Sequence, residues 1–417
     1  MSVSAESIRI TNRIGQKKNG LRKTRETEIA QIAWRLRLFE PDIGPEEIES
    51  VTRVIASGML SMGAVTEQFE DAFSKFTGAR HALAVTNATA ALHLAHHAMG
   101  VGPGDEVIVP ALTFVATANS VLYTGATPVF ADIVGPHDLN IDPEDVARKI
   151  TPRTRGIVAV HYAGYPVAMD RIMEIARAHG LYVVEDASHA PGSMYRGRSA
   201  GTLSDIGCFS FYPNKNMTTA EGGMIVTGDD ELAERMRRAR SHGMTTVTWD
   251  RIRGHAHSYD VTGLGFNYRI DELRSALGLI QLNRLADNNK RRRDLMQRYL
   301  TNLVRLPMIQ VPFGLPDEPV SHHICPVLLA KGIDRKRFMD GMREAGIQTS
   351  IHYPPTHLFS YYREGFGCRE GMLPITESVA RQEVTLPLYP GMSTADVEEV
   401  VLTTEKMLEA SFALERG

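Results

Sequence analysis

One lysine stands between an apolar run and a glycine-rich tail in the stretch FSFYPNKNMTTAEGG, residues 209–223. When apolar neighbours shield an ammonium group from water, its pKa falls and its neutral amine becomes a usable nucleophile. Most lysines lie in exposed loops, however, so Lys215 taken alone does not establish a reactive site.

A carboxylate ends another apolar run, at Asp186 in VVEDASHAPG. Ligands of parallel α/β sheets bind at the carboxyl ends of the strands, although a lone aspartate there is also typical of a helix cap or a turn. A later predicted strand, DIGCFSF, is followed shortly by Lys215. We therefore expect the carboxylate and the amine to emerge at the same edge of the sheet.

Two further stretches could bind a cofactor. NATAAL, residues 87–92, places small residues and a hydroxyl where a strand gives way to a helix, so backbone N–H groups there could bind an anion. A tightly packed helix start is the alternative. The hydroxyls of Ser210, Thr218 and Thr219 could add donors to the same phosphate. Phe114 follows the next strand, where a flat ring could stack on it, although core packing is the usual role of a phenylalanine.

These four features together match the requirements of pyridoxal phosphate. In such a site the lysine forms a Schiff base with the cofactor. The aspartate keeps the pyridine nitrogen protonated, so that the ring can withdraw electrons. The combination is more informative than any one of its parts.

The elements that must position these residues alternate between strand and helix from about residue 40 onward, which is typical of an α/β domain. Short apolar runs predict strands at 82–86, 105–110, 127–133, 155–161, 181–186, 205–211 and 224–228. Between them we expect helices within 87–98, 113–125, 166–180 and 229–243.

The pattern changes after about residue 250. Two long helices, 271–288 and 289–303, precede a smaller α+β portion with strands at 323–329 and 348–353. Ser393 and Asp396 form a capping box that predicts the start of the last helix. We predict a basic N-terminal extension (1–37), a large α/β domain (38–250) and a smaller C-terminal α+β domain (251–417).

The composition excludes several classes of protein. The 417 residues carry a formal net charge of −3, which argues against nucleic acid or a membrane surface as a partner. No apolar run predicts a transmembrane helix, and three scattered cysteines fit a cytoplasmic protein without disulfides. His93, His96 and His97 have helical spacing, but no carboxylate or cysteine accompanies them, so we expect no metal site.

The chain resembles the DegT/DnrJ/EryC1/StrS family of sugar aminotransferases along almost all of its length beyond the N-terminal arm. The motifs that carry the resemblance, in family order, are TNATAALHLA, GDEVIVPALTFVATANSVLYTGATPVFADI, VHYAGYP, VEDASHAPGSMYRGR, FSFYPNKNMTTAEGG, GFNYRIDELRSALGLIQL and IHYPPTH. The resemblance implies the type I fold of aspartate aminotransferase: a large domain whose mostly parallel seven-stranded sheet is flanked by helices, and a smaller C-terminal domain.

The resemblance also implies roles for single residues. Lys215 would carry the pyridoxal phosphate and Asp186 would pair with its pyridine nitrogen, while Phe114 would stack on its ring. His189 would lie near the phenolic oxygen, where many members have Gln. The other residues implied are Thr89, the Ala90 backbone and Ser210 at the phosphate, Asn267 reaching the phosphate from the neighbouring subunit, and His352 and Tyr353 in the sugar pocket.

The activity implied is amine transfer from an amino acid, by family habit L-glutamate, to a keto sugar linked to a nucleoside diphosphate. Pyridoxamine phosphate and 2-oxoglutarate would form in the first half-reaction of a ping-pong mechanism, in a homodimer with shared active sites. His189 and the variant AEGG favour C4 of a hexose or pentose. The alternatives are a cyclitol ketone, a 3-keto sugar, a non-catalytic regulator and a dehydratase; Lys215 and Asp186 weigh against the last two.

Overall fold

The computed structural model describes residues 34–245 and 258–412. Nearly all of the predicted N-terminal extension, 1–37, lies outside these ranges, as does the predicted domain boundary at 250–251. No helix within the described residues is long and apolar enough to cross a membrane.

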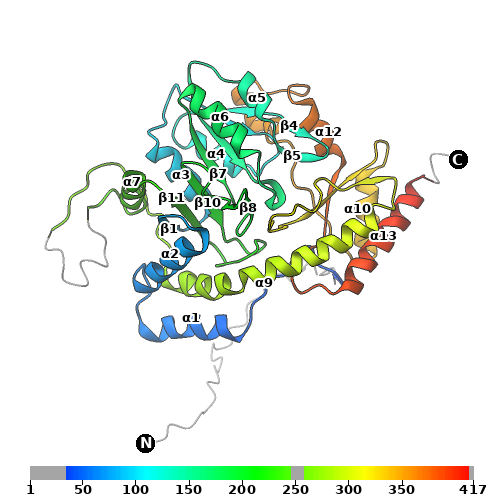
Figure 1. Ribbon diagram of the computed structural model, residues 1–417, viewed down its shortest axis with the longest axis horizontal. Helices are drawn as coiled ribbons and strands as arrows, with labels where there is room; N and C mark the ends of the chain where they lie inside the picture. The colour runs from blue at the N-terminus through cyan, green and yellow to red at the C-terminus, as the bar shows by residue number, and fades with distance from the viewer. Residues whose placement is uncertain (1–33, 246–257, 413–417) are drawn as a thin grey trace, which may run out of the picture. The chain divides into compact units, whose positions relative to one another are not determined.

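A seven-stranded sheet forms the centre of the large α/β portion (Figure 1). Its strands, in spatial order, are β1 (His81–Val85), β11 (Gly223–Thr227), β10 (Ile206–Ser210), β7 (Tyr182–Asp186), β6 (Thr154–Val160), β2 (Glu106–Pro110) and β3 (Thr127–Ala131). Only β11 runs antiparallel to its neighbours, and all other pairs are parallel. The mostly parallel sheet that we expected is therefore confirmed.

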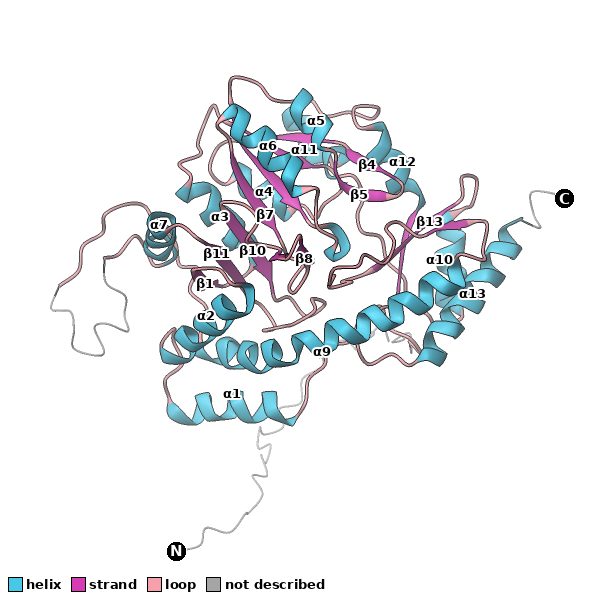
Figure 2. Ribbon diagram, viewed as in Figure 1, coloured by secondary structure: helices cyan, strands magenta, loops and turns pink. Residues whose placement is uncertain are grey.

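Helices cover both faces of this sheet (Figure 2). One face packs against α3 (Ala88–Ala98), α4 (Ala116–Leu122) and α7 (Asp230–Arg240), and the other against α2 (Ala64–Thr77), α5 (Pro143–Arg148), α6 (Met169–His179) and part of α9 (Glu272–Leu303). Successive strand residues serve opposite faces: Val183 contacts the core beneath α6, and Val184 the core beneath α3. Burial on both faces explains the uninterrupted apolar runs of these strands.

A second, three-stranded antiparallel sheet packs against the C-terminal part of α9. Its strands are β12 (Ile309–Gln310), β13 (Cys325–Leu329) and β14 (Glu383–Leu386). A separate apolar core joins this sheet to α10 (Arg335–Glu344) and α13 (Thr394–Phe412). The predicted capping box of α13 is present: the N–H of Ser393 donates to Asp396 Oδ2 (2.7 Å), and the N–H of Asp396 donates to Ser393 Oγ (3.2 Å).

The described elements not yet given are α1 (Pro45–Ser57), β4 (Ile133–Gly135), β5 (Asp138–Ile141), η1 (Tyr162–Gly164), β8 (Met194–Tyr195), β9 (Arg198–Ser199), η2 (Thr356–Leu358), α11 (Ser360–Phe366) and α12 (Pro374–Gln382). Of these, β4 pairs with β5 and β8 pairs with β9, each pair antiparallel.

The prediction of two helices at 271–288 and 289–303 is wrong, because α9 is continuous over 32 residues. The Asn288–Asn289 pair does not interrupt it, since both side chains bond to other segments rather than to the helix backbone. Asn288 Nδ2 donates to Asp42 Oδ2 (3.2 Å), and Asn289 Nδ2 donates to the Pro191 carbonyl (2.8 Å).

The predicted strand at 348–353 is also absent. Only Ser350 pairs with the sheet, through an isolated bridge to Thr385. Two residues later the N–H of His352 donates to the side chain of Glu383 instead of a strand carbonyl (2.7 Å), and two prolines follow at 354–355. Proline has no N–H for a ladder, so the segment runs alongside β14 as an irregular strand edge.

Candidate active site

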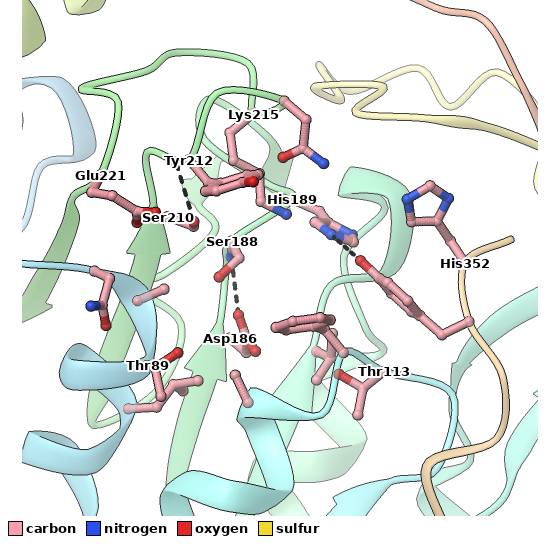
Figure 3. Close-up of a pocket in the computed structure, with 18 of the residues that line it drawn as sticks. Thr89, Thr113, Asp186, Ser188, His189, Ser210, Tyr212, Lys215, Glu221 and His352 are labelled. Atoms are coloured by element: carbon pink, nitrogen blue, oxygen red, sulfur yellow. Dashed lines mark hydrogen bonds between the residues drawn. The ribbon is translucent and has the colours of Figure 1, made fainter. Parts of the chain in front are cut away.

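A cavity of about 610 Å³ opens where the parallel strands of the central sheet end (Figure 3). Val160, Asp186 and Ser210, the last residues of β6, β7 and β10, line it, and Thr113 follows β2 in its wall. Lys215 lines the same cavity. The expectation that carboxylate and amine meet at one edge of the sheet therefore agrees with the structure.

Asp186 is buried, and its carboxylate is held from two sides. Thr117 Oγ1 donates to Oδ2 (2.9 Å), and the N–H of Ser188 donates to Oδ1 (3.2 Å). Its neighbour Glu185 points to the opposite face of the sheet, where it accepts hydrogen bonds from His161 and from the loop at 201–204. The alternation of a strand thus separates the carboxylate that faces the cavity from the one that supports a loop.

Lys215 sits in a turn after β10, where its N–H donates to the Tyr212 carbonyl (2.9 Å). Figure 3 shows its amine directed into the cavity. Burial lowers the pKa of Lys215 to about 8, although the nearby carboxylate of Asp186 acts in the opposite direction. About a tenth of the molecules therefore have a neutral amine at pH 7, and about half at pH 8.

The start of α3 forms the base of the cavity. Asn87 is its N-cap and accepts a hydrogen bond from the N–H of Ala90 at Oδ1 (2.8 Å), so this donor is already used. Ala88 and Thr89 line the cavity, whereas Ala90 does not. The first-turn N–H groups that Asn87 does not bind are the ones suited to an anion.

A glycine allows β11 to approach this helix start. A Cβ on Gly223 would lie 2.7 Å from the backbone carbon of Asn87 and 2.8 Å from the nitrogen of Ala88. Ser210, opposite Gly223 in the β10–β11 register, faces the cavity as expected. Thr218 and Thr219 do not line it, because their hydroxyls donate to the carbonyls of Phe211 and Glu221.

Aromatic and imidazole rings form the wall opposite α3. Phe114 lines the cavity and is 59% exposed, so core packing does not explain it. Tyr353 lies 6.0 Å from it, centroid to centroid, and its hydroxyl is 3.0 Å from Nε2 of His189. Burial and the charge of Lys215 hold the pKa of His189 well below its usual range, so this imidazole is neutral.

Asn267 and the clustered histidines lie elsewhere. Asn267 bridges to Ser241 and does not line the cavity. His93 Nδ1 is 3.0 Å from Tyr268 Oη, and His96 Nδ1 is 2.9 Å from Tyr182 Oη. Among the described residues no cluster of His, Cys, Asp and Glu could hold a metal ion.

Several residues of the site were missed from the sequence. Thr117 follows Phe114 by three positions, in the first turn of the helix after a strand. A hydroxyl at such a position could have been identified as a possible site residue. Tyr212 and Glu221 lie in the quoted lysine stretch and line the cavity, but nothing in their spacing distinguished them. Glu383 and Thr385 are remote in sequence, and only their contacts with His352 place them behind the cavity.

These residues fit pyridoxal phosphate. The helix start provides donors for a phosphate, Asp186 an acceptor for a protonated ring nitrogen, Lys215 an amine for an aldehyde, and Phe114 a flat surface for an aromatic ring. In addition, Nδ1 of His189 is buried and has no partner among the described residues. The volume is also in the range of small-molecule sites.

Comparison with known proteins agrees with this geometry. The sequence profile of the DegT/DnrJ/EryC1/StrS aminotransferase family matches residues 41–405. The Bacillus subtilis spore coat polysaccharide biosynthesis protein SpsC is 43% identical over 366 residues, which cover 87% of this chain and 94% of SpsC.

Solved structures are similar over the same region. Helicobacter pylori PseC, an aminotransferase involved in the biosynthesis of pseudaminic acid, has a TM-score of 0.84 at 31% identity, covering 90% of this chain and 99% of PseC. The PLP-form of Spr1654, a putative sugar aminotransferase of Streptococcus pneumoniae, has a TM-score of 0.83 at 28% identity, covering 89% and 98% of the two chains.

Proposed function

The chain belongs to the DegT/DnrJ/EryC1/StrS family and is a sugar aminotransferase that depends on pyridoxal phosphate; from this premise we propose that it aminates a keto sugar carried by a nucleoside diphosphate, at C4, with L-glutamate as the donor. The observation that carries the proposal is that Lys215 and Asp186 line one cavity together with the start of α3.

Each residue has a distinct task in this proposal. Ala88, Thr89 and Ser210 bind the phosphate of the cofactor. Asp186 keeps the ring nitrogen protonated, and the hydrogen bond from Thr117 orients its carboxylate. Pyridoxal phosphate, when bound, supplies an aldehyde that condenses with amines and a ring that withdraws electrons.

Lys215 has two tasks. Its partly neutral amine would attach the cofactor, and Nζ, when it is not bonded to the cofactor, would take up and release a proton as general base and acid. One site of this kind handles donor and acceptor in turn, so we expect ping-pong kinetics. The rings of Phe114 and Tyr353 and the imidazole of His189 form part of the wall of the cavity that Lys215 lines.

The sugar and the assembly belong to the same proposal. Position C4 rests on His189 and the variant AEGG. The involvement of PseC in pseudaminic acid biosynthesis and of SpsC in spore coat polysaccharide biosynthesis is consistent with a sugar substrate. Lys215 is the only lysine or arginine lining the cavity among the described residues. Further positive charges for a diphosphate would therefore have to come from outside the lining of this cavity. A second subunit could supply them, which supports a homodimer with shared sites.

Absorbance spectroscopy tests the proposal. The purified protein loaded with pyridoxal phosphate should absorb in the visible, lose this band with L-glutamate and regain it with a nucleotide-linked 4-keto sugar from a panel that also contains 3-keto sugars and cyclitol ketones. Recovery with only a cyclitol ketone would identify the alternative substrate class. A band that no amino donor changes would indicate a non-catalytic regulator.

A further inference from the structure

A buried carboxyl, a hydroxyl and an imidazole form a hydrogen-bonded series behind the cavity wall, called the hydrogen-bond chain below. Glu383 and Thr385 are two positions apart on β14 and face the same side. Thr385 Oγ1 lies 2.5 Å from Glu383 Oε1 and 2.8 Å from His352 Nδ1. Glu383 Oε2 also accepts the N–H of His352 (2.7 Å), so the hydrogen-bond chain closes on itself.

The number of protons in this hydrogen-bond chain determines which ring nitrogen of His352 carries a hydrogen. The threonine hydroxyl has one proton. When Glu383 is ionised, that proton goes to Oε1, and Nδ1 of His352 must donate to Oγ1. The other nitrogen, Nε2, then carries a lone pair and can only accept.

His352 lines both the cavity and a small void of about 10 Å³ that Thr385 also lines. Nδ1 of His352 is hydrogen-bonded to Thr385, and Nε2 has no hydrogen-bond partner among the described residues. Some polar atoms of the described residues are fully buried without a partner, but Nε2 of His352 is not one of them. Because Nε2 is not fully buried, a ligand can reach it. The imidazole therefore presents one nitrogen to the hydrogen-bond chain and leaves the other available to a ligand.

The same three groups admit the opposite arrangement when Glu383 is protonated. Oε2 faces the N–H of His352, so the carboxyl proton must lie on Oε1 and point to Thr385. The hydroxyl then donates to Nδ1, and Nε2 bears the hydrogen. Nε2 thereby becomes a donor although the imidazole remains neutral throughout.

We propose that His352, Thr385 and Glu383 form a proton relay whose cavity end is Nε2 of His352. A proton binds Nε2, the Nδ1–H proton moves to Thr385 Oγ1, and the hydroxyl proton moves to Glu383 Oε1; the reverse sequence delivers a proton to the cavity. His352 is the residue that contacts the substrate, and Thr385 and Glu383 are positioning residues. Resting on the proposed function, the relay serves a hydroxyl or carbonyl oxygen of the sugar.

The surroundings support a carboxyl that exchanges its proton near neutrality. Burial raises the pKa of Glu383 to about 7, while burial and the charge of Lys215 lower the pKa of His352 to about 4. The imidazole therefore does not hold a second proton at neutral pH. The carboxyl group of Glu383 is the group that holds the extra proton of the relay. The other titratable or charged groups that influence this pair are Arg335, Tyr162, Tyr353, Cys325, His189 and His323.

Nitrogen NMR of the protein loaded with pyridoxal phosphate and labelled with 15N-histidine tests the relay, with the His352→Asn variant identifying the signals. In the wild type, Nε2 should change from unprotonated to protonated as the pH falls through about 7. In Glu383→Gln the amide NH₂ donates to Thr385, so Nε2 should stay protonated at every pH. Thr385→Ser keeps the hydroxyl and should retain the titration, whereas Thr385→Val should lose it.

Three outcomes would overturn the relay: no titration of Nε2 in the wild type, an unchanged titration in Glu383→Gln, or a lost titration in Thr385→Ser. Thermal unfolding and the visible band of the cofactor show whether each variant is folded. No sugar takes part in this measurement, so it can fail while amine transfer occurs, and amine transfer can fail while the relay titrates.

Discussion

Two opposing effects set the pKa of the Lys215 amine. Burial removes water from the amine and lowers its pKa to about 8, whereas the negative charge of Asp186 acts to raise it. A lysine in solution has a pKa of about 10.4 and is almost wholly protonated at pH 8. The site thus supplies a partly neutral amine without a dedicated base beside it.

This shift predicts how fast the cofactor-free protein reacts with pyridoxal phosphate. Only the neutral amine attacks an aldehyde, so the rate of covalent capture should rise about tenfold per pH unit below the pKa and level off above about 8. Stopped-flow absorbance between pH 6 and 10 measures it. A rate that still rises about sevenfold between pH 9 and 10 would show an unshifted lysine.

At this scale the sequence predicted the residues that touch the cavity better than those behind it. Lys215, Asp186 and Phe114 were recognisable because in combination they match what pyridoxal phosphate requires, although none of them establishes a site alone. Glu383 was not, because its function depends on contacts with His352, which no spacing reveals. The N–H of Ala90 was expected at the phosphate, but the cap Asn87 takes it.

At the scale of elements, the contact between α3 and β11 sets the anion site. The helix start can lie over the strand only because Gly223 has no side chain. Helix N-termini bind phosphates through backbone N–H groups, and these must point at the ligand. A shift of this turn would therefore weaken cofactor binding without touching Lys215 or Asp186.

Gly223→Ala should lower the affinity for pyridoxal phosphate by about ten- to a hundredfold, because a misplaced turn loses at least one hydrogen bond to a charged group, worth about 1.5–3 kcal/mol. Equilibrium titration of the visible band measures this affinity. Gly228→Ala, just past the other end of β11, is the matched control, since its Cβ would meet no atom within 4 Å. Equal affinities in the two variants would contradict the role given to the close approach.

The order and type of the elements could be predicted because buried parallel strands and amphipathic helices have distinct periods. The two errors have physical causes. Asparagines usually favour turns, but in α9 their side chains are occupied by other segments. The segment 348–353 has the composition of a strand, yet Glu383 and two prolines prevent it from extending the ladder.

At the scale of the whole molecule, the proposed sharing of sites between two copies rests on the lining of the cavity and on exposed apolar surface. The cavity has one cation among the described residues, and Asn267 lies outside it. The helix α1 also exposes Ile48 and Ile55, which are 65% and 60% accessible in the single chain. A second copy could supply further cations and cover this apolar surface.

Mixed dimers test this sharing. Lys215→Ala and Asn267→Ala should each have low activity alone, since one lacks the amine and the other a contact to the phosphate. If Asn267 serves the partner's site, unfolding and refolding the two variants together should create dimers with one intact site and restore activity. A mixture no more active than its components would place Asn267 in its own subunit's site or outside both.

The central claim is that Lys215 carries the cofactor. Borohydride reduction of the protein loaded with pyridoxal phosphate, followed by peptide mass spectrometry, tests it most directly. We predict a pyridoxyl group on the peptide containing Lys215 in the wild type and none on any peptide of Lys215→Ala. A pyridoxyl group on another lysine of the wild type, with Lys215 unmodified, would contradict the account.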